Sequence, residues 1–163
     1  MTAVSPQIAE AAEGGRSYFD GDEHVLTVRI YYEDTDAGGV VYYANYLKFA
    51  ERGRSALLRL GGWENGRLVR GDYAGQADGV AFVMRHFAAD YLKSAVLDDL
   101  LEIRTRVVSV GGATLEMAQT IRRGAEVLVK AKAKLACVSA ATQRPARMPE
   151  ALRADMLARL AKE

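Results

Sequence analysis

The chain contains one helical pattern followed by four strand patterns, and this order constrains its fold more than any other feature. Within residues 42–60, apolar and small residues recur at spacings of three and four, as on one face of an amphipathic helix. Strand-like runs follow at 80–92, 100–110, 114–123 and 126–139, and a further one precedes the helix and ends near Tyr32. One helix followed by consecutive strands predicts an α+β domain with an antiparallel sheet.

Glycines within and after the helical pattern refine this prediction. Gly53 lies inside the pattern, although glycine costs roughly 1 kcal/mol relative to alanine in a helix. We therefore expect the helix to approach the sheet closely at Gly53. Gly61 and Gly62 are expected to end the helix, and the polar, glycine-rich stretch 63–79 indicates a loop with a short helix.

The last strand pattern indicates which side of the sheet is buried. Every second residue from Val127 to Cys137 is apolar, whereas Lys130, Lys132 and Lys134 occupy the other face. This alternation is typical of an antiparallel sheet with one buried and one solvated face. Cys137 falls on the apolar face, so we interpret it as a packing residue rather than a reactive thiol.

Length and composition agree with a single globular domain. The chain has 163 residues, of which 50% are hydrophobic and 26% charged. We divide it into a flexible N-terminal tail at 1–22, one domain at 23–150 and a C-terminal helical tail at 151–163. No secretory leader and no apolar run of the roughly 20 residues needed for a membrane span is recognised, so a cytoplasmic protein without membrane insertion is expected.

Charge and metal-ligand content exclude several classes of function. The 22 basic and 21 acidic residues nearly balance, so no net field favours a nucleic-acid partner or an anionic membrane. One cysteine and two distant histidines provide neither an internal disulfide nor a zinc cluster. We therefore expect no metal site.

The stretch from Tyr32 to Tyr46 is the candidate functional segment. It reads Tyr-Glu-Asp-Thr-Asp-Ala-Gly-Gly-Val-Val-Tyr-Tyr-Ala-Asn-Tyr and joins a strand to the helix through an acidic turn. Such a turn brings a carboxylate and backbone N–H groups together, as acyl-transfer chemistry requires. Asp34, Thr35 and Asp36 are also common turn and cap residues, so the residues alone leave a purely structural role open.

Several motifs in this order resemble one enzyme family. The stretch from Arg29 to Leu47, followed by Glu-Arg-Gly-Arg at 51–54, resembles the signature of the 4-hydroxybenzoyl-CoA thioesterase family. The segments 81–85, 97–103 and 111–115 resemble the same family, and the similarity covers about residues 25 to 150. Within this family, the motifs most resemble the branch of bacterial acyl-CoA thioesterases associated with the Tol-Pal envelope system.

This resemblance implies a fold, an activity and an assembly. It implies a hotdog fold, in which the antiparallel sheet wraps around the long helix. It also implies hydrolysis of a short-chain or small aromatic acyl-CoA to a free acid and CoA, without a metal or redox cofactor. Members commonly form dimers or dimers of dimers with active sites at subunit boundaries, so a homo-oligomer, such as a homotetramer, is expected.

The resemblance also assigns the catalytic residues. Asp36 matches the family's catalytic carboxylate, which acts as a nucleophile or as a general base on water, and Asp34 is assigned to the turn. Tyr43, seven residues later, matches the position whose backbone N–H stabilises the oxyanion. The Tol-Pal-associated branch usually has histidine at this position, so only a backbone role carries over to Tyr43.

Other polar residues keep two interpretations. Asn45 is interpreted as a helix hydrogen-bonding residue and Tyr46 as packing. Glu51 is either a second carboxylate near the site or a surface ion-pair partner of a neighbouring arginine. His86 is interpreted as structural or surface. The lysine row and Arg122–Arg123 are either a solvated face or a cradle for CoA phosphates.

Two rival functions follow from the same residues. A hotdog dehydratase would normally need a paired histidine and acid, and neither histidine lies in the helix motif. A non-enzymatic domain would instead bind acyl carrier protein or an envelope-assembly partner and retain only residual hydrolysis. Acyl carrier protein is acidic, so the lysine row is the surface expected to contact it.

Overall fold

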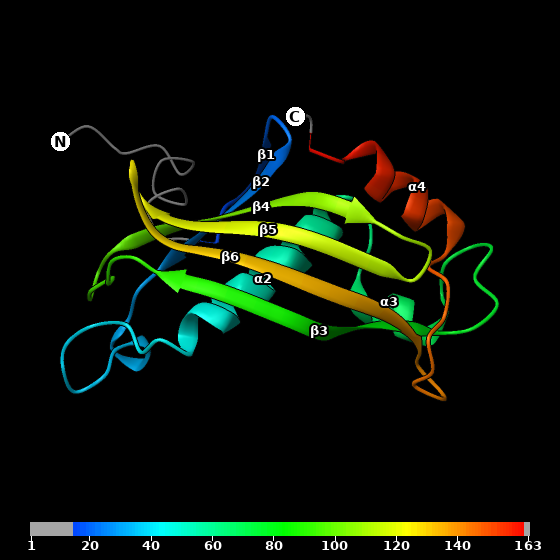
Figure 1. Ribbon diagram of the computed structural model, residues 1–163, viewed down its shortest axis with the longest axis horizontal. Coiled ribbons are helices and arrows are strands. Elements are labelled where there is room, and N and C mark those ends of the chain that lie inside the picture. Colours follow the sequence, from blue (N-terminus) through cyan, green and yellow to red (C-terminus); the bar gives the residue numbers. More distant parts are fainter. Residues whose placement is uncertain (1–14, 162–163) are drawn as a thin grey trace, which may run out of the picture.

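The fold consists of one antiparallel sheet, one long helix across it and short helices at one end. The computed structural model describes residues 15–161. Figure 1 shows α2 lying along one face of the sheet, with α3 and α4 near the same end. In chain order the elements are β1 (Ser17–Asp20), β2 (Glu23–Arg29), η1 (Tyr32–Asp34), α2 (Asn45–Leu60), α3 (Asn65–Arg70), β3 (Val80–Tyr91), β4 (Leu100–Val110), β5 (Thr114–Arg123), β6 (Glu126–Ser139) and α4 (Glu150–Ala158).

The sheet has six strands in the order β1-β2-β4-β5-β6-β3, and every paired neighbour is antiparallel. The predicted α+β class and antiparallel sheet are confirmed. Because β3 pairs only with β6, one side of this twelve-residue strand remains a free sheet edge. A β-bulge between Met84 and His86 interrupts its ladder.

The observed strand boundaries agree with the predicted ones after α2, whereas the start of α2 and the N-terminal segment differ from the prediction. The four strands after α2 lie within the predicted ranges. The helix starts at Asn45 rather than at 42, because Tyr43 and Ala44 form a turn before it. The predicted tail at 1–22 is wrong for β1, which pairs with β2 as a hairpin. Residues 1–14 lie outside the described part of the chain.

The inward face of the sheet and one face of α2 form the core. Leu115, Met117 and Ile121 of β5 are buried there, and Cys137 of β6 is fully covered. Burial raises the pKa of the Cys137 thiol to about 11, which agrees with its predicted packing role. Lys130 and Lys132 on the outward face are exposed, as the alternation predicts.

Close contact between α2 and the sheet occurs at Gly53, as predicted. A Cβ atom at this position would lie 2.7 Å from Ile103 Cγ2 and 3.0 Å from Thr105 Oγ1. Gln119 lies beneath the same turn, where its amide nitrogen donates to the Ala50 carbonyl at 2.8 Å and to Thr105 Oγ1 at 2.9 Å. The absence of a side chain at Gly53 therefore lets the helix reach polar partners on the sheet.

His24 is a buried histidine on β2, and its position was not predicted. Its Nε2 lies 2.7 Å from Ser17 Oγ of β1. Burial, with a smaller contribution from the charge of Arg159, lowers the pKa of His24 to about 4. The ring is therefore neutral near pH 7 and supports the β1–β2 hairpin.

Within residues 15–161, no helix is both long and apolar enough to cross a membrane.

Replacing Gly53 by alanine should destabilise the fold. Overpacking costs about 1–3 kcal/mol, whereas alanine recovers about 1 kcal/mol of helix propensity, so we expect a net loss of about 1 kcal/mol. Urea unfolding of the variant measures this loss. Gly66→Ala in α3 is the matched control, since its Cβ would meet only the end of the Arg70 side chain at 3.4 Å. Equal stability of Gly53→Ala and the wild type would contradict the close contact.

Candidate functional site

The candidate site is built where β2 leaves the sheet and α2 begins. After β2 the chain forms the short helix η1 and then a turn closed by an antiparallel bridge between Thr35 and Val41. We call residues 34–41 the acid turn. Figure 1 shows this segment projecting beyond the end of the sheet, near the end of β3. The sequence-predicted residues Asp36 and Tyr43 therefore flank the same end of α2.

Asp36 is held in the acid turn by its own neighbours. Its Oδ1 accepts a hydrogen bond from the Gly38 N–H at 2.8 Å, and its carbonyl accepts one from Gly39 at 3.0 Å. Gly39 has φ +82°, a conformation that a glycine adopts without strain. The Asp36 side chain is exposed, and its Oδ2 accepts no hydrogen bond from residues 15–161. One carboxylate oxygen is held by the turn, and the other has no partner among the described residues.

Asp34 fastens the turn to the helix, in agreement with its predicted turn role. Its Oδ2 accepts a hydrogen bond from the Tyr31 N–H at 2.8 Å. Its carbonyl accepts from the Tyr42 N–H at 3.0 Å and from Asn45 Nδ2 at 2.8 Å. The predicted hydrogen-bonding role of Asn45 is therefore confirmed, and its partner is the backbone of the acid turn.

Tyr43 lies in the turn that leads into α2. Its carbonyl accepts a hydrogen bond from Tyr46, whereas its own N–H donates to no group among the described residues. This free donor lies at the positive end of the helix dipole. The Tyr43 side chain is 61% exposed and contacts the rings of Tyr42 and Tyr91. A hydrogen bond with the Tyr43 side chain raises the pKa of Tyr42.

A segment after β3 braces the acid turn, and no sequence pattern predicts this contact. The Val41 N–H donates to the Ala95 carbonyl at 2.9 Å, and Val40 forms an antiparallel bridge with Val96. The Ala95 N–H in turn donates to the Tyr46 hydroxyl at 3.1 Å. Tyr46 is buried, as its predicted packing role requires. Backbone contacts of this kind have no side-chain pattern from which they could be found.

An ion-pair cluster anchors the bracing segment to the sheet. Arg123 contacts the Asp99 carboxylate at 2.7 Å and also pairs with Glu126. Lys93 pairs with the other oxygen of Glu126 at 2.7 Å, and these hydrogen bonds from Lys93 and Arg123 lower the pKa of Glu126 to about 2. Arg123 therefore has structural partners, and its interpretation as a phosphate ligand is not needed to explain it.

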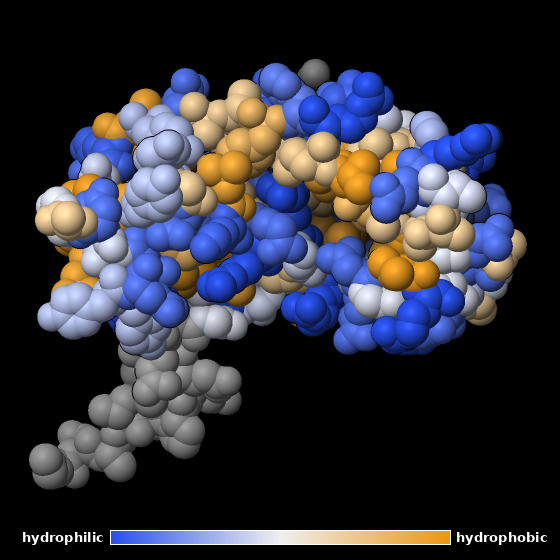
Figure 2. Space-filling view, turned by 90° about the horizontal axis from the view of Figure 1, so that it is seen from below, coloured by the Kyte–Doolittle hydropathy of each residue, from blue (hydrophilic) through white to orange (hydrophobic). Residues whose placement is uncertain are grey.

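A cavity of about 340 Å³ opens between α2, α3, β3 and β6. We call it the β3 cavity. Figure 2, seen from below the view of Figure 1, shows a hollow with apolar atoms at its base. The lining residues form an apolar wall and a polar wall, and they are Glu51, Arg54, Ser55, Leu58, Asn65, Val69, Ala81, Phe82, Met84 and Leu135.

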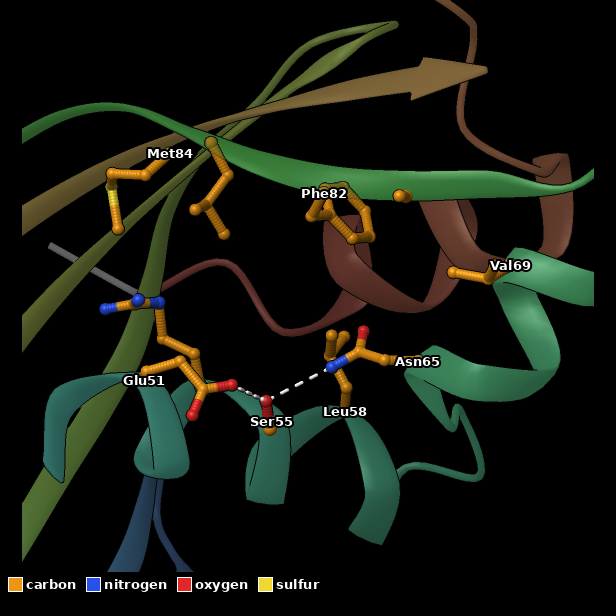
Figure 3. Close-up of a pocket in the computed structure, with 10 residues that line it drawn as sticks. Glu51, Ser55, Leu58, Asn65, Val69, Phe82 and Met84 are labelled. Atoms are coloured by element: carbon orange, nitrogen blue, oxygen red, sulfur yellow. Dashed lines mark hydrogen bonds between the residues drawn. The ribbon is translucent and has the colours of Figure 1, made fainter. Parts of the chain in front are cut away.

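The polar wall of the β3 cavity contains a hydrogen-bonded chain from α2 to α3. Ser55 Oγ donates to Glu51 at 2.8 Å and accepts from Asn65 Nδ2 at 3.1 Å, as Figure 3 shows. The sequence offered an ion pair with a neighbouring arginine as one role for Glu51. Among the described residues Glu51 forms no direct ion pair, and its charge acts on Arg54 only through space.

The acid turn precedes the start of α2, whereas the β3 cavity lies along the helix from Glu51 onwards. Glu51 is six residues beyond Asn45, and a helix rises 1.5 Å per residue, so it lies about 9 Å from the helix start along the axis. His86, in β3, is exposed, as its surface interpretation predicts.

Within residues 15–161, no cluster of three or more His, Cys, Asp or Glu residues is placed to hold a metal ion.

Comparison with known proteins identifies the chain's relatives. Residues 38–130 match the profile of the family described as the thioesterase superfamily. The chain is 42% identical over 127 residues to the acyl-CoA thioesterase YbgC of Haemophilus influenzae, covering 78% of this chain and 89% of that protein. It is 39% identical over 129 residues to the acyl-CoA thioester hydrolase YbgC of Escherichia coli O157:H7, covering 78% and 91%.

A solved structure shows the same architecture. The crystal structure of a Bartonella henselae protein described as a probable thioesterase superimposes with a TM-score of 0.73 at 39% sequence identity. The superposition covers 78% of this chain and 99% of that protein. The hotdog fold implied by the motifs is therefore confirmed.

Replacing Asn45 by alanine should loosen the acid turn. The substitution removes the donor to the Asp34 carbonyl in a largely buried place, so we expect a loss of about 1–2 kcal/mol in unfolding free energy. Chemical denaturation measures the loss. Asn65→Ala is the control, because the Asn65 side chain is exposed and should change stability by less than about 0.5 kcal/mol. Equal effects of the two substitutions would contradict a stabilising role for the hydrogen bond from Asn45 to the Asp34 carbonyl.

Proposed function

Since this chain belongs to the thioesterase superfamily, we propose that it hydrolyses acyl-CoA thioesters to a free acid and CoA, with Asp36 as the catalytic carboxylate. The observation that carries the proposal is the acid turn. It leaves one Asp36 oxygen without a partner among residues 15–161, shortly before the start of α2, where the Tyr43 N–H also has no partner among these residues. Relatives named as acyl-CoA thioesterases support the CoA thioester as the substrate class.

The Asp36 carboxylate either attacks the thioester carbon or activates a water molecule. As a nucleophile its free oxygen bonds to the thioester carbon, the CoA thiolate leaves, and water cleaves the resulting mixed anhydride. As a general base it takes a proton from water, whose oxygen bonds to the same carbon. In both routes the carbon–sulfur bond breaks, and the thiolate ends as the free thiol after taking up a proton.

The end of α2 supplies stabilisation for the charge that develops on the thioester oxygen. The Tyr43 N–H is an unpaired donor, and the helix dipole adds positive potential at the same place. This role uses the backbone alone. It therefore tolerates tyrosine where related enzymes usually have histidine, and it requires the exact course of the chain that Asp34 and Asn45 hold.

A second copy of the chain is part of this proposal. The free edge of β3 is flanked by exposed apolar side chains, including Val83, Met84, Tyr91 and Leu92. Antiparallel pairing of two β3 strands about their centres would set Tyr91 of one copy near Val80 of the other. Tyr43, which follows the acid turn, contacts Tyr91 of the same copy. The acid turn of one copy would then face the β3 cavity of its partner.

This arrangement explains why the acid turn and the β3 cavity lie apart along α2 in one chain. The acyl group would enter the partner's β3 cavity while its thioester lies at the acid turn. A volume of about 340 Å³ fits a short-chain or small aromatic acyl group. A dimer is the smallest such assembly, and the proposed homotetramer would be two of them.

Several observations support hydrolysis over the rival functions. His24 is buried with a pKa lowered to about 4, and His86 lies on β3 away from the acid turn, so neither provides the histidine of a dehydratase. On the lysine face, Lys134 already lies 3.7 Å from Glu116. Binding of acyl carrier protein at Lys130 and Lys132, an envelope-system role and a cytoplasmic location remain predictions.

Replacing Asp36 by asparagine should abolish most hydrolysis. We expect kcat to fall by about 10² to 10⁴-fold, because asparagine keeps the turn-forming oxygen but loses the basic and nucleophilic charge. Release of free CoA from a panel of acyl-CoAs measures the loss.

Asp34→Asn is the matched control for this experiment. Its side-chain oxygen still accepts from the Tyr31 N–H, so it should retain hydrolysis within about tenfold of the wild type. Equal rates for Asp36→Asn and the wild type would contradict the catalytic assignment. Background rates for every substrate with the wild type would contradict the thioesterase function itself.

A further inference from the structure

One buried cation in the β3 cavity forms no ion pair with any of residues 15–161. Arg54 is only 8% exposed and lines the cavity from α2. Its Nη1 donates to the Gln119 side-chain oxygen at 2.9 Å. Within residues 15–161 the Arg54 guanidinium has no other hydrogen bond and no ion pair. The remaining donors of this side chain have no protein partner among these residues, but they are not sealed from solvent.

An acyl group that fills the cavity would take these donors out of water, which is costly unless the group itself supplies an acceptor. A guanidinium has five N–H donors, and removing it from water without a partner is unfavourable. Burial lowers the pKa of Arg54, while the nearby charge of Glu51 opposes this shift. Glu51 itself is directed to Ser55, which donates to it, so it does not neutralise Arg54 by direct contact.

The apolar wall of the cavity would receive a carbon chain. Leu58, Phe82 and Met84 face the cavity from α2 and β3, as Figure 3 shows. An apolar pocket with a small number of placed polar groups is the usual form of a site that orients a ligand by its polar end. The acyl chain would contact the wall, and Arg54 would be left for a group at its far end.

We propose that Arg54 is a specificity residue of the β3 cavity and selects acyl groups whose far end carries an acceptor oxygen. This inference rests on the proposed thioesterase function and on the partner-cavity arrangement. A hydroxyl or a carboxylate at the far end provides the same acceptor chemistry. A hydroxyl also donates a hydrogen bond to Glu51, whereas a carboxylate is repelled by it.

A matched set of six-carbon substrates tests the inference. Hexanoyl-CoA ends in a methyl group, 6-hydroxyhexanoyl-CoA in a hydroxyl and adipyl-CoA in a carboxylate. The wild type should hydrolyse at least one oxygen-bearing substrate with a kcat/KM at least about tenfold above that for hexanoyl-CoA, because an unpaired buried donor disfavours the methyl end. The faster of the two oxygen-bearing substrates identifies the oxygen that is recognised.

Arg54→Met should remove this preference and bring the three kcat/KM values within about threefold of one another, since the oxygen-bearing ends lose their partner and the methyl end no longer leaves a donor unpaired. Arg52→Met is the control, because Arg52 is the exposed neighbour on the same helix. Glu51→Gln should raise kcat/KM for adipyl-CoA relative to 6-hydroxyhexanoyl-CoA by removing the repulsion. Thermal unfolding of each variant reports whether the loss of the Gln119 contact affects folding.

The outcomes separate this inference from the function on which it rests. Equal kcat/KM for the three substrates with the wild type would overturn the role of Arg54 while leaving the thioesterase function in place, and this result needs no variant. An equal fall for all three substrates in Arg54→Met would also overturn it, since Arg54 would then hold the subunit or the partner together. Absence of hydrolysis with every substrate would overturn the proposed function as well.

Discussion

The close contact of α2 with the sheet at Gly53 is the constraint on which the rest of the structure depends. Without a side chain there, the helix lies near enough to the sheet for Gln119 to reach the Ala50 carbonyl and for Arg54 to reach Gln119. These contacts fix the distance of α2 from the sheet and its rotation about its own axis. The rotation places Arg54 in the β3 cavity, and the distance places the start of the helix beside the acid turn.

The reactive end of the molecule is organised by backbone contacts rather than by burial. The Asp34 carbonyl joins the turn to the start of α2, and Ala95 joins it to the segment after β3. Asp36 stays exposed, so solvent or substrate reaches its free oxygen. Preorganised donors and charges of this kind cost no rearrangement when the reaction occurs. The same chain leaves Tyr43 and Tyr91 exposed at the edge where a second copy is proposed to pair.

Sequence reasoning recovered the parts of this fold that side-chain patterns encode. The alternation from Val127 to Cys137 predicted the buried face, and Gly53 predicted the close contact. It missed β1, whose short hairpin depends on pairing with β2, and the bracing role of Ala95, which acts through its backbone. The position of Asp36 came from a motif, but only the structure shows that one of its oxygens is held and the other free. The cavity could not be predicted, because its walls come from separate elements.

The central claim is that the acid turn of one copy and the β3 cavity of its partner form one active site. Mixed oligomers of two inactive variants test it directly: Asp36→Asn removes the carboxylate, and Met84→Trp fills the cavity from its exposed wall. In a mixed dimer, one site would combine an intact Asp36 with an intact cavity. With equal amounts of the two variants about half of the dimers are mixed, and each has one working site of two. Mixing should therefore restore about a quarter of wild-type CoA release, a non-additive result that two residues of one shared site predict. Release that stays at the level of the separate variants, although mixed dimers are present, would contradict a site shared between copies.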